Sequence, residues 1–476
     1  MTSGFTRPDW VEQRAYQQEA IRAWVEAGGR GIYNMATGTG KTVTSLLTAA
    51  EIAESLDGNL ALVIAVPYQH LVDQWAEDVS DFGSNPVLAY QSRADWQERM
   101  DREILEFNMG VRPSLVVITT HTTFASDPFQ KTLNRLNQDR TMLIADEVHH
   151  LGSPHHRESL PDDIGLRLGL SATPERFYDD DGTETLFEYF GDGVVFEYSL
   201  KKAIEEGALV EYYYLPHVIE LTDEEAEQYS ALSSKIARLA AKQSGDLGDA
   251  DLQGNTSLKY ALFKRARLIG TAANKLEKLQ ELLEDREDIE HTLVYCGDGS
   301  VEDDMTGQTK RHVDATVDIL RDDLHLAVNR FTARESQAER EVLLEEFETG
   351  ELQALVAIRC LDEGIDVPAT KTAYVLASSS NPRQFVQRRG RILRKHPSKN
   401  HAVIHDFIVA PPKTMAGGAV SDDEFKTERR LVRKELERVN LFSEAARNHP
   451  DDDVPGLPTS SGSLSELKTR YNLRQL

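Results

Sequence analysis

The sequence predicts an α/β fold built on two parallel β-sheets. Short apolar runs of strand length alternate with helical patterns in two separate stretches of the chain, as they do when helices connect parallel strands. Each run ends at a polar or small residue, and in open α/β sheets ligands gather at the carboxyl ends of the strands. The expected strands are 31–35, 60–66, 115–119, 142–145 and 166–170 in the first stretch, and 292–296, 326–331, 354–358, 373–376 and 402–407 in the second.

Shifts in composition divide the chain into four expected parts. Two of them are the α/β stretches, one is a connecting segment of strand and helix, and the last is a helical tail with a flexible linker rich in Pro, Gly, Ser and Asp. Their expected bounds are 1–200 for the first α/β domain, 201–270 for the connecting segment, 271–412 for the second α/β domain and 413–476 for the tail.

The connecting segment has a strand pattern followed by helical patterns. Residues 209–221 are strand-like and contain three successive tyrosines, Tyr212–Tyr214, which could stack bases but more simply pack between domains. Thr222 and Glu225 have the spacing of a capping box and should open a helix. A second helical pattern runs over 258–283, and the polar insertion 297–310 is expected to be a surface loop.

The composition is that of a folded protein outside membranes. The chain has 476 residues, 40% hydrophobic and 28% charged, which suits two or three domains with cores of their own. Its most apolar run, 60–66, is much shorter than the ~18 residues that span a bilayer, and residues 1–10 lack the pattern of a secretory signal. Cys296 and Cys360 are too few for a disulfide framework or a cysteine-based zinc site. We therefore expect a soluble, cytoplasmic protein with no membrane partner.

The distribution of charge is uneven. The net charge is −26, and an acidic surface of this kind repels nucleic acid unless positive charge is concentrated somewhere. Residues 383–399 supply such a concentration, with seven Lys or Arg and no acid. Taken alone, a basic helix is more often a solvated face. Against the acidic background it favours a polyanionic ligand.

Residues 36–42, Ala-Thr-Gly-Thr-Gly-Lys-Thr, have the composition of a phosphate-binding loop between a strand and a helix. Glycines let backbone N–H groups turn toward phosphate oxygens, and the start of the following helix adds positive partial charge. Lys41 would reach the β- and γ-phosphates of ATP, and the Thr42 hydroxyl would bind Mg²⁺. Met35 stands where the general pattern has its first Gly. The residues expected to contact ATP here are Thr37, Gly38, Thr39, Gly40, Lys41 and Thr42.

Residues 142–149 provide the second half of a nucleotide site. An apolar strand ends at Asp146 and Glu147, and adjacent carboxylates are costly unless a cation neutralises them. Asp146 would bind Mg²⁺, and Glu147 would polarise the attacking water. Without the phosphate-binding loop earlier in the chain, this pair would as readily be a helix N-cap.

Together with the basic segment, these elements resemble superfamily 2 helicases and translocases. The similarity runs from about residue 14 to 406 and is strongest to the DExH branch of XPB-like helicases and restriction-enzyme motor subunits. It implies two tandem RecA-like domains that form an ATP cleft, with a helical insertion and a helical C-terminal tail. In the first half it implies adenine recognition by Arg14 and Gln17, and coupling of hydrolysis to strand movement by His149, Ser171 and Thr173.

The resemblance also implies further contacts. In the second half, Gly364 and Asp366 would bind ATP, with Asp366 on the ribose, while Gln387, Arg391 and Arg394 would face the γ-phosphate. Arg391 and Arg394, three positions apart, would share one helix face. One position departs from the family pattern, because Ile358 replaces a hydroxyl residue and Arg359 next to it would take over the contact. Nucleic-acid contacts are implied for Pro67, Gln69, Thr119, Thr120, His121, Gly297 and Arg359.

The function that these residues imply is ATP-dependent movement along DNA, single-stranded or duplex, with RNA left open. Nucleic acid that favours closure of the two halves would couple its own binding to ATP turnover. Two alternatives stay open. One is an ATP-gated clamp, or the motor subunit of a repair or defence complex, that unwinds little by itself. The other is a small-molecule kinase or ATPase in which the basic segment 383–399 is ordinary surface.

Overall fold

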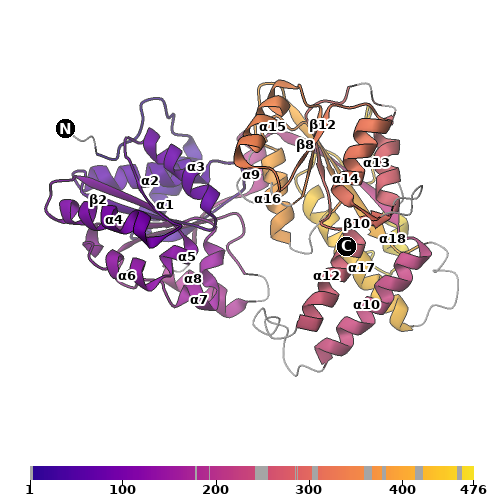
Figure 1. Ribbon diagram of the computed structural model, residues 1–476, viewed down its shortest axis with the longest axis horizontal. Coiled ribbons are helices and arrows are strands. Elements are labelled where there is room, and N and C mark those ends of the chain that lie inside the picture. Colours follow the sequence, from indigo (N-terminus) through magenta and orange to yellow (C-terminus); the bar gives the residue numbers. More distant parts are fainter. Residues whose placement is uncertain are drawn as a thin grey trace. The chain divides into compact units, whose positions relative to one another are not determined.

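A computed structural model of the chain describes residues 4–176, 179–191, 193–241, 256–284, 286, 288–302, 309–358, 367–377, 382–412, 422–457 and 464–475. The chain divides into two compact units, Met1–Ala203 and Ile204–Leu476. Each unit is built on one parallel sheet that is flanked by helices (Figure 1). The predicted α/β class with two parallel sheets and a helical C-terminal tail is confirmed.

The sheet of the first unit has seven strands, and every pairing in it is parallel. β2, β4 and β5 are buried along their whole length, because helices cover both faces of a central parallel strand and only apolar or small side chains fit there. The strand order is β3 (Val87–Ala89), β4 (Ser114–Thr120), β2 (Leu60–Val66), β5 (Thr141–Ala145), β6 (Leu166–Ser171), β1 (Arg30–Met35) and β7 (Val194–Tyr198).

The helices of this part pack their apolar faces on the sheet. Trp96 on α4 and Phe129 on α6 meet edge to face, with ring centroids 5.8 Å apart, in a core that the central strands complete. The helices are α1 (Ala15–Glu26), α2 (Lys41–Ser55), α3 (Gln69–Asp81), α4 (Arg93–Asn108), α5 (His121–Phe124), α6 (Asp127–Leu133), α7 (Pro154–Arg157), α8 (Asp180–Tyr189) and α9 (Leu200–Glu205), with 3₁₀ turns η1 (Gln138–Arg140) and η2 (Val148–Gly152).

The sheet of the second unit has six strands, again all parallel. Its edge strand β8 comes from the segment that the sequence analysis placed in the connection, and it pairs with β15 over ten positions. The order is β12 (Val328–Phe331), β13 (Ala354–Ala357), β9 (Thr292–Tyr295), β14 (Thr372–Val375), β15 (His401–Ala410) and β8 (Glu211–Glu220). The polar insertion, expected to be a surface loop throughout, contains paired strands instead, because β10 (Ser300–Glu302) pairs antiparallel with β11 (Thr309–Arg311).

The helices of the second unit follow the predicted pattern with one break. The capping box is present, because the Thr222 N–H donates to Glu225 Oε2 at 3.0 Å and the Glu225 N–H donates to Thr222 Oγ1 at 3.2 Å. The helical pattern 258–283 forms two helices rather than one. The helices are α10 (Asp223–Ala241), α12 (Thr256–Gly270), α13 (Asn274–Glu284), α14 (His312–Asp318), α15 (Gln337–Thr349), α16 (Pro382–Ile392), α17 (Asp422–Ser443) and α18 (Leu464–Arg470), with the π-helical turn η3 (Ile319–Asp323).

The tyrosines of β8 serve the interior of the second unit. Tyr212 and Tyr214 are fully buried, and the ring of Tyr214 stacks on Phe442 of α17 with centroids 5.3 Å apart. Burial removes Tyr212 and Tyr214 from any base-stacking role, whereas Tyr213 between them is half-buried, with its ring 5.2 Å from the guanidinium of Arg447. Across the described residues, every helix is too short or too polar to traverse a lipid bilayer.

A buried ion-pair network fastens α17 to β15. Arg438 Nε donates to Asp406 Oδ2 at 2.9 Å, and Arg438 Nη1 donates to Glu435 Oε1 at 2.9 Å. The Tyr214 hydroxyl donates to the same Asp406 oxygen at 2.8 Å, and Glu435 Oε2 accepts the Val409 N–H at 2.9 Å. All of these side chains are at least nine-tenths buried, so each charge depends on its partners to offset the loss of water.

We predict that Arg438→Leu destabilises the second unit by about 3–5 kcal/mol, because it leaves two buried carboxylates without their cation. The measurement is hydrogen exchange of β15 peptides, which reports the unfolding free energy of this unit. Arg433→Leu is the matched control on the same helix, where an exposed pair with Glu437 at 2.9 Å contributes no more than about 0.5 kcal/mol. Equal effects of the two substitutions would contradict the assignment.

Candidate nucleotide site

The phosphate-binding loop joins β1 to α2 in the first unit. Gly38 and Gly40 have φ angles of +86° and +83°, in the left-handed region that side chains rarely adopt. This conformation lets Lys41 begin α2, whose first N–H groups have no partner within the helix. The loop therefore presents backbone donors and the positive end of a helix, which is the arrangement that binds phosphate.

The start of α1 is fastened to this loop. The Tyr16 hydroxyl donates to the backbone oxygen of Thr39 at 2.6 Å, and Gln17 Nε2 donates to Thr44 Oγ1 at 3.2 Å. Gln17 Oε1 in turn accepts the Arg14 N–H at 2.9 Å. Both ends of the Gln17 amide are thus engaged, and its side chain is buried. In this structure Arg14 and Gln17 brace the loop.

Two polar groups of the loop are poorly satisfied within the protein. The buried Thr37 hydroxyl has no hydrogen-bond partner among the described residues. Lys41 Nζ reaches only the backbone oxygen of Met35, at 3.4 Å, which is a long contact. Phosphate oxygens would satisfy both groups, so the loop fits a nucleoside triphosphate.

Asp146 and Glu147 follow β5 directly. The Asp146 N–H donates to Ala65 O at 2.9 Å and holds the turn on β2. Asp146 Oδ1 accepts the Glu147 N–H at 2.9 Å, and its Oδ2 accepts the indole N–H of Trp75 at 3.2 Å. Glu147 itself has a φ of +44°, a strained conformation for a residue with a side chain.

The electrostatic environment of Asp146 and Glu147 favours the binding of a cation at this turn. Burial, and then the charge of Glu147, raise the pKa of Asp146 to about 6, while Lys41 and the Trp75 hydrogen bond counteract part of that rise. The described residues contain no group of three or more His, Cys, Asp or Glu side chains that could hold a metal. One or two protein oxygens with the remaining positions left to phosphate and water is the donor set that Mg²⁺ uses in nucleotide sites.

A short polar path leads from Glu147 to the end of β6. His149 Nδ1 lies 3.4 Å from Glu147 Oε2 and 3.4 Å from Ser171 Oγ, and the Thr173 N–H donates to Ser171 Oγ at 3.1 Å. Arg176 donates a hydrogen bond to the backbone oxygen of His149. The structure therefore brings together the three residues predicted to couple hydrolysis to movement.

The expected nucleic-acid contacts of the first unit differ in exposure. Gln69 is exposed at the start of α3, and Pro67 is half-buried. Thr119 is fully buried, with its hydroxyl bonded to Ala89 O at 2.7 Å, and the ring of His121 is 2% exposed. Thr120 Oγ1 caps α5 by accepting the Thr123 N–H at 3.2 Å. The side chains of Thr119, Thr120 and His121 are thus all buried, at the end of β4 and the start of α5.

In the second unit, α16 carries Gln387 and Arg391, both half-buried. The helix ends at Ile392, so Arg394 lies beyond its last turn instead of sharing a helix face with Arg391. Gly297 follows β9, and a Cβ there would meet the backbone oxygen of Gly270 at 2.9 Å, which explains the need for glycine. Gly364, Asp366 and Arg359 lie outside the described residues.

Two arginines of the basic segment are structural. Arg388 Nη1 donates to Ala377 O at 2.9 Å, and Arg389 Nη1 donates to Leu441 O at 2.5 Å. Both side chains are about 95% buried, so they fasten α16 to its own unit. The contacts of Trp75 with Asp146 and of Arg176 with His149 were not predicted from the sequence, because no local pattern marks a distant hydrogen bond.

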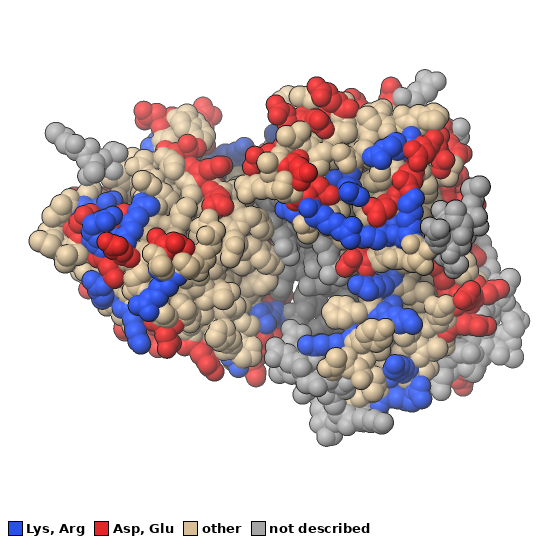
Figure 2. Space-filling view, in the orientation of Figure 1, with Lys and Arg blue, Asp and Glu red and all other residues tan. Residues whose placement is uncertain are grey.

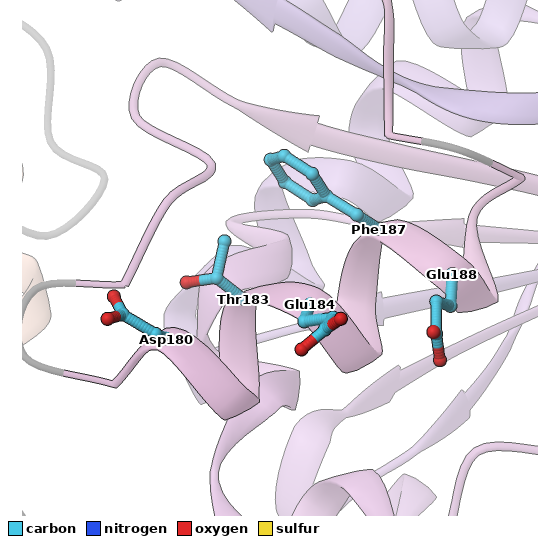
Figure 3. A pocket seen from close by; sticks show the side chains of 5 residues that line it. All are labelled: Asp180, Thr183, Glu184, Phe187 and Glu188. Carbon is cyan, nitrogen blue, oxygen red and sulfur yellow. The ribbon is translucent and has the colours of Figure 1, made fainter.

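A hollow of about 470 Å³ runs along α8 (Figure 3). Its lining includes Asp180, Glu184 and Glu188, whose carboxylates disfavour a phosphate anion. None of the loop or carboxylate residues described above lines it. The nucleotide candidate is therefore the phosphate-binding loop with the β5 turn.

Comparisons with known proteins agree with this geometry. The family model described as "Type III restriction enzyme, res subunit" matches residues 11–176, which contain both the loop and the carboxylate pair. The model described as "Helicase conserved C-terminal domain" matches residues 274–396. The chain is a helicase that resembles members of superfamily 2 in both matched regions. The enzyme class predicted from the sequence, an ATP-hydrolysing helicase, is confirmed with it.

Two named relatives and one solved structure are similar to this chain over most of its length. The helicase is 29% identical to "DNA 3'-5' translocase XPB2" of Sulfurisphaera tokodaii, over 81% of this chain and 80% of the relative. It is 28% identical to "Putative DNA 3'-5' helicase Rad25" of Haloarcula marismortui, over 80% of this chain but only 50% of the relative. The fold resembles the DNA-bound Type ISP restriction-modification enzyme LlaBIII, with a TM-score of 0.60 and 15% identity, over 98% of this chain and 32% of that chain.

Proposed function

We propose that the helicase couples hydrolysis of Mg-ATP to movement along DNA. The observation that carries this proposal is the β5 turn, where the adjacent carboxylates of Asp146 and Glu147 lie within electrostatic reach of Lys41 of the phosphate-binding loop. The relatives named as DNA 3'-5' translocase and helicase support DNA as the track and 3′-to-5′ as the direction.

The first unit would hold and activate the nucleotide. Lys41 and the backbone of 37–42 would bind the phosphates, and Thr42 with Asp146 would bind Mg²⁺. Glu147 would polarise the attacking water, and its buried Oε2 makes no hydrogen bond among the described residues. His149, Ser171 and Thr173 would report the state of the γ-phosphate to the end of β6.

The second unit would supply positive charge in the transition state. Gln387, Arg391 and Arg394 would act on the γ-phosphate, and Gly364 with Asp366 would bind the ribose side of ATP. The burial of Arg388 and Arg389 supports this division, because Arg391 and Arg394 are the half-buried arginines among the side chains of the segment that the structure describes.

The proposed contacts with nucleic acid narrow to exposed or backbone groups. Gln69 with Pro67, the backbone at the junction of β4 and α5 around Thr120, and Gly297 remain as proposed contacts to the sugar–phosphate backbone, and Arg359 stays a proposal from the sequence. Thr119 and His121 would act by shaping the strand end.

A second candidate is an ATP-driven motor within a larger repair or defence enzyme, with little unwinding of its own. The match to 32% of the restriction-modification enzyme favours it, because the whole chain there corresponds to one part of a longer protein. Displacement of a strand from a tailed duplex separates the two candidates, since the second predicts DNA-stimulated ATPase activity without displacement.

The direct test is ATPase activity with single-stranded DNA, duplex DNA and RNA over a salt series. We predict stimulation by DNA in the wild type, and loss of both basal and stimulated activity in Lys41→Ala. Glu147→Gln should bind ATP with unchanged affinity but hydrolyse it about 10³-fold more slowly, because the carboxylate that polarises water is gone. Absence of stimulation by any nucleic acid at low salt would favour a small-molecule ATPase.

Arg391→Ala should leave ATP affinity within a few-fold of wild type and lower DNA-stimulated turnover about 10³-fold, the effect of removing an arginine finger. Lys395→Ala removes a nearby exposed cation and serves as the control for loss of charge alone. Measurement of ATP binding and of stimulated turnover in both variants decides the matter. Full stimulated activity in Arg391→Ala would refute this role.

Trp75→Phe should raise the Mg²⁺ concentration needed for half-maximal ATPase activity by about 10-fold at pH 6.5. The pKa of Asp146 is raised to about 6, so the carboxylate gains a proton and loses affinity for Mg²⁺ as the pH falls through that value. The indole hydrogen bond favours the ionised form, and its loss moves this weakening to higher pH. At pH 8 the difference from wild type should shrink.

Trp96→Phe is the matched control, because Trp96 is equally buried in the same unit but packs on Phe129 away from the carboxylates. A similar Mg²⁺ requirement in both variants at both pH values would show that the indole does not tune the site.

A further inference from the structure

The outer face of α12 exposes two large aromatic side chains. Tyr260 is 65% exposed and Phe263 is 61% exposed, although Leu258 and Ala261 on the opposite face are buried. Lys264 and Arg267 are exposed as well. These four residues are spaced i, i+3, i+4 and i+7, so they form one continuous row along the helix. We call Tyr260, Phe263, Lys264 and Arg267 the α12 row.

The charge of α12 is unusual for this chain. Its 15 residues contain four Lys or Arg and no acid, in a protein with a net charge of −26. Figure 2 shows Lys and Arg side chains gathered over the region of α10 and α12. A basic helix that also leaves aromatic rings in water matches a polyanion with flat apolar faces, and poorly matches an acidic peptide or an apolar groove.

Neighbouring groups reinforce the positive character. Arg265 points inward, 5.7 Å from the centre of the Tyr229 ring, and donates to Ser233 Oγ at 3.3 Å. The pKa of Lys434 on α17 is lowered by burial and then by the charge of Arg265, which shows that cations are crowded here. The acids near these cations are Glu435 and Glu437 of α17, whose charges act on Lys434, and Asp298, which lies 3.8 Å from Arg267.

The row is continuous with a segment already proposed to touch nucleic acid. Arg267 lies 3.8 Å from Asp298, and the space beside Gly297 is filled by the backbone oxygen of Gly270 at the end of α12. A strand bound at Gly297 would therefore meet Arg267 first and the aromatic rings next. From Tyr260 to Arg267 the helix rises about 10 Å, the length of roughly three stacked bases.

We propose that the α12 row binds one strand of nucleic acid, with Tyr260 and Phe263 stacked on bases and Lys264 and Arg267 on phosphates. The proposal deepens the function proposed above and rests on it for the identity of the ligand. Stacking requires accessible base faces, so the ligand is a single-stranded segment and not an intact duplex. The binding is tolerant of sequence, because every base has an aromatic face.

The test uses the full chain and a fluorescent single-stranded 20-mer whose anisotropy gives Kd over a salt series. Tyr260→Ala with Phe263→Ala removes both proposed base stacks and should weaken binding by about 5- to 100-fold for each stack lost. A 2-aminopurine base in the strand should be quenched on binding to wild type and less so in this variant, which a purely electrostatic role would not produce. Basal ATPase activity without nucleic acid should not change.

Two further variants separate stacking from charge. Phe263→Tyr keeps a ring at the same place and should bind like wild type. Lys264→Ala with Arg267→Ala should weaken binding equally for all sequences and reduce the slope of log K against log salt by about 1.4, as expected for two lost phosphate contacts on a single strand. Trp10→Ala removes an exposed aromatic residue, 69% exposed in the first unit, and should have no effect.

The outcomes distinguish this inference from the proposed function. If wild type binds single-stranded DNA and the double alanine variant binds equally well, the α12 row is not a base-stacking site, although the motor function stands. The same conclusion follows if the variant loses only duplex binding, or if the row proves to contact a protein. If wild type binds no nucleic acid, both proposals fail together.

Discussion

Two adjacent carboxylates at the buried end of β5 are the constraint around which the first unit is arranged. Asp146 and Glu147 repel one another, and burial makes that repulsion costly, which shows in the raised pKa of Asp146. The strained backbone at Glu147, the indole of Trp75 and the approach of Lys41 all serve to hold this pair in place. Binding of a cation and phosphates would offset this repulsion. Ligand binding would therefore also stabilise the folded phosphate-binding loop.

An acidic protein can bind a polyanion when some of its cations hold the fold together and others remain exposed at the surface. Arg388, Arg389 and Arg438 are buried and hold elements of the second unit together. On α12, Arg265 makes the structural contacts with Ser233 and Tyr229, so the exposed Lys264 and Arg267 would be the cations that act on a ligand. Net charge of −26 keeps nonspecific attraction low, so affinity comes from a few positions and stays sensitive to salt.

Local pattern predicted much of this architecture, and long-range contacts account for what it missed. The strand at 60–66 and the helix start at Thr222–Glu225 could be predicted, because an apolar run and a capping box are visible in neighbouring residues. The glycines of the phosphate-binding loop likewise indicate its left-handed backbone conformation. By contrast, the membership of β8 in the second sheet, the end of α16 before Arg394 and the bond from Trp75 to Asp146 depend on partners far along the chain. Those distant partners cannot be predicted from the spacing of residues along the chain.

The pairing of β8 with β15 has a consequence for how the chain is made. Tyr214 and Asp406, bonded across these strands, are 192 positions apart. On the ribosome the first unit has all of its strands once β7 has emerged, and it can fold while synthesis continues. The tyrosine-rich strand β8 must wait until β15 and α17 arrive to cover it. A stalled or truncated product would leave β8 unpaired and uncovered, and such a strand can pair with other chains and aggregate. The segments synthesised last therefore protect the protein from aggregation.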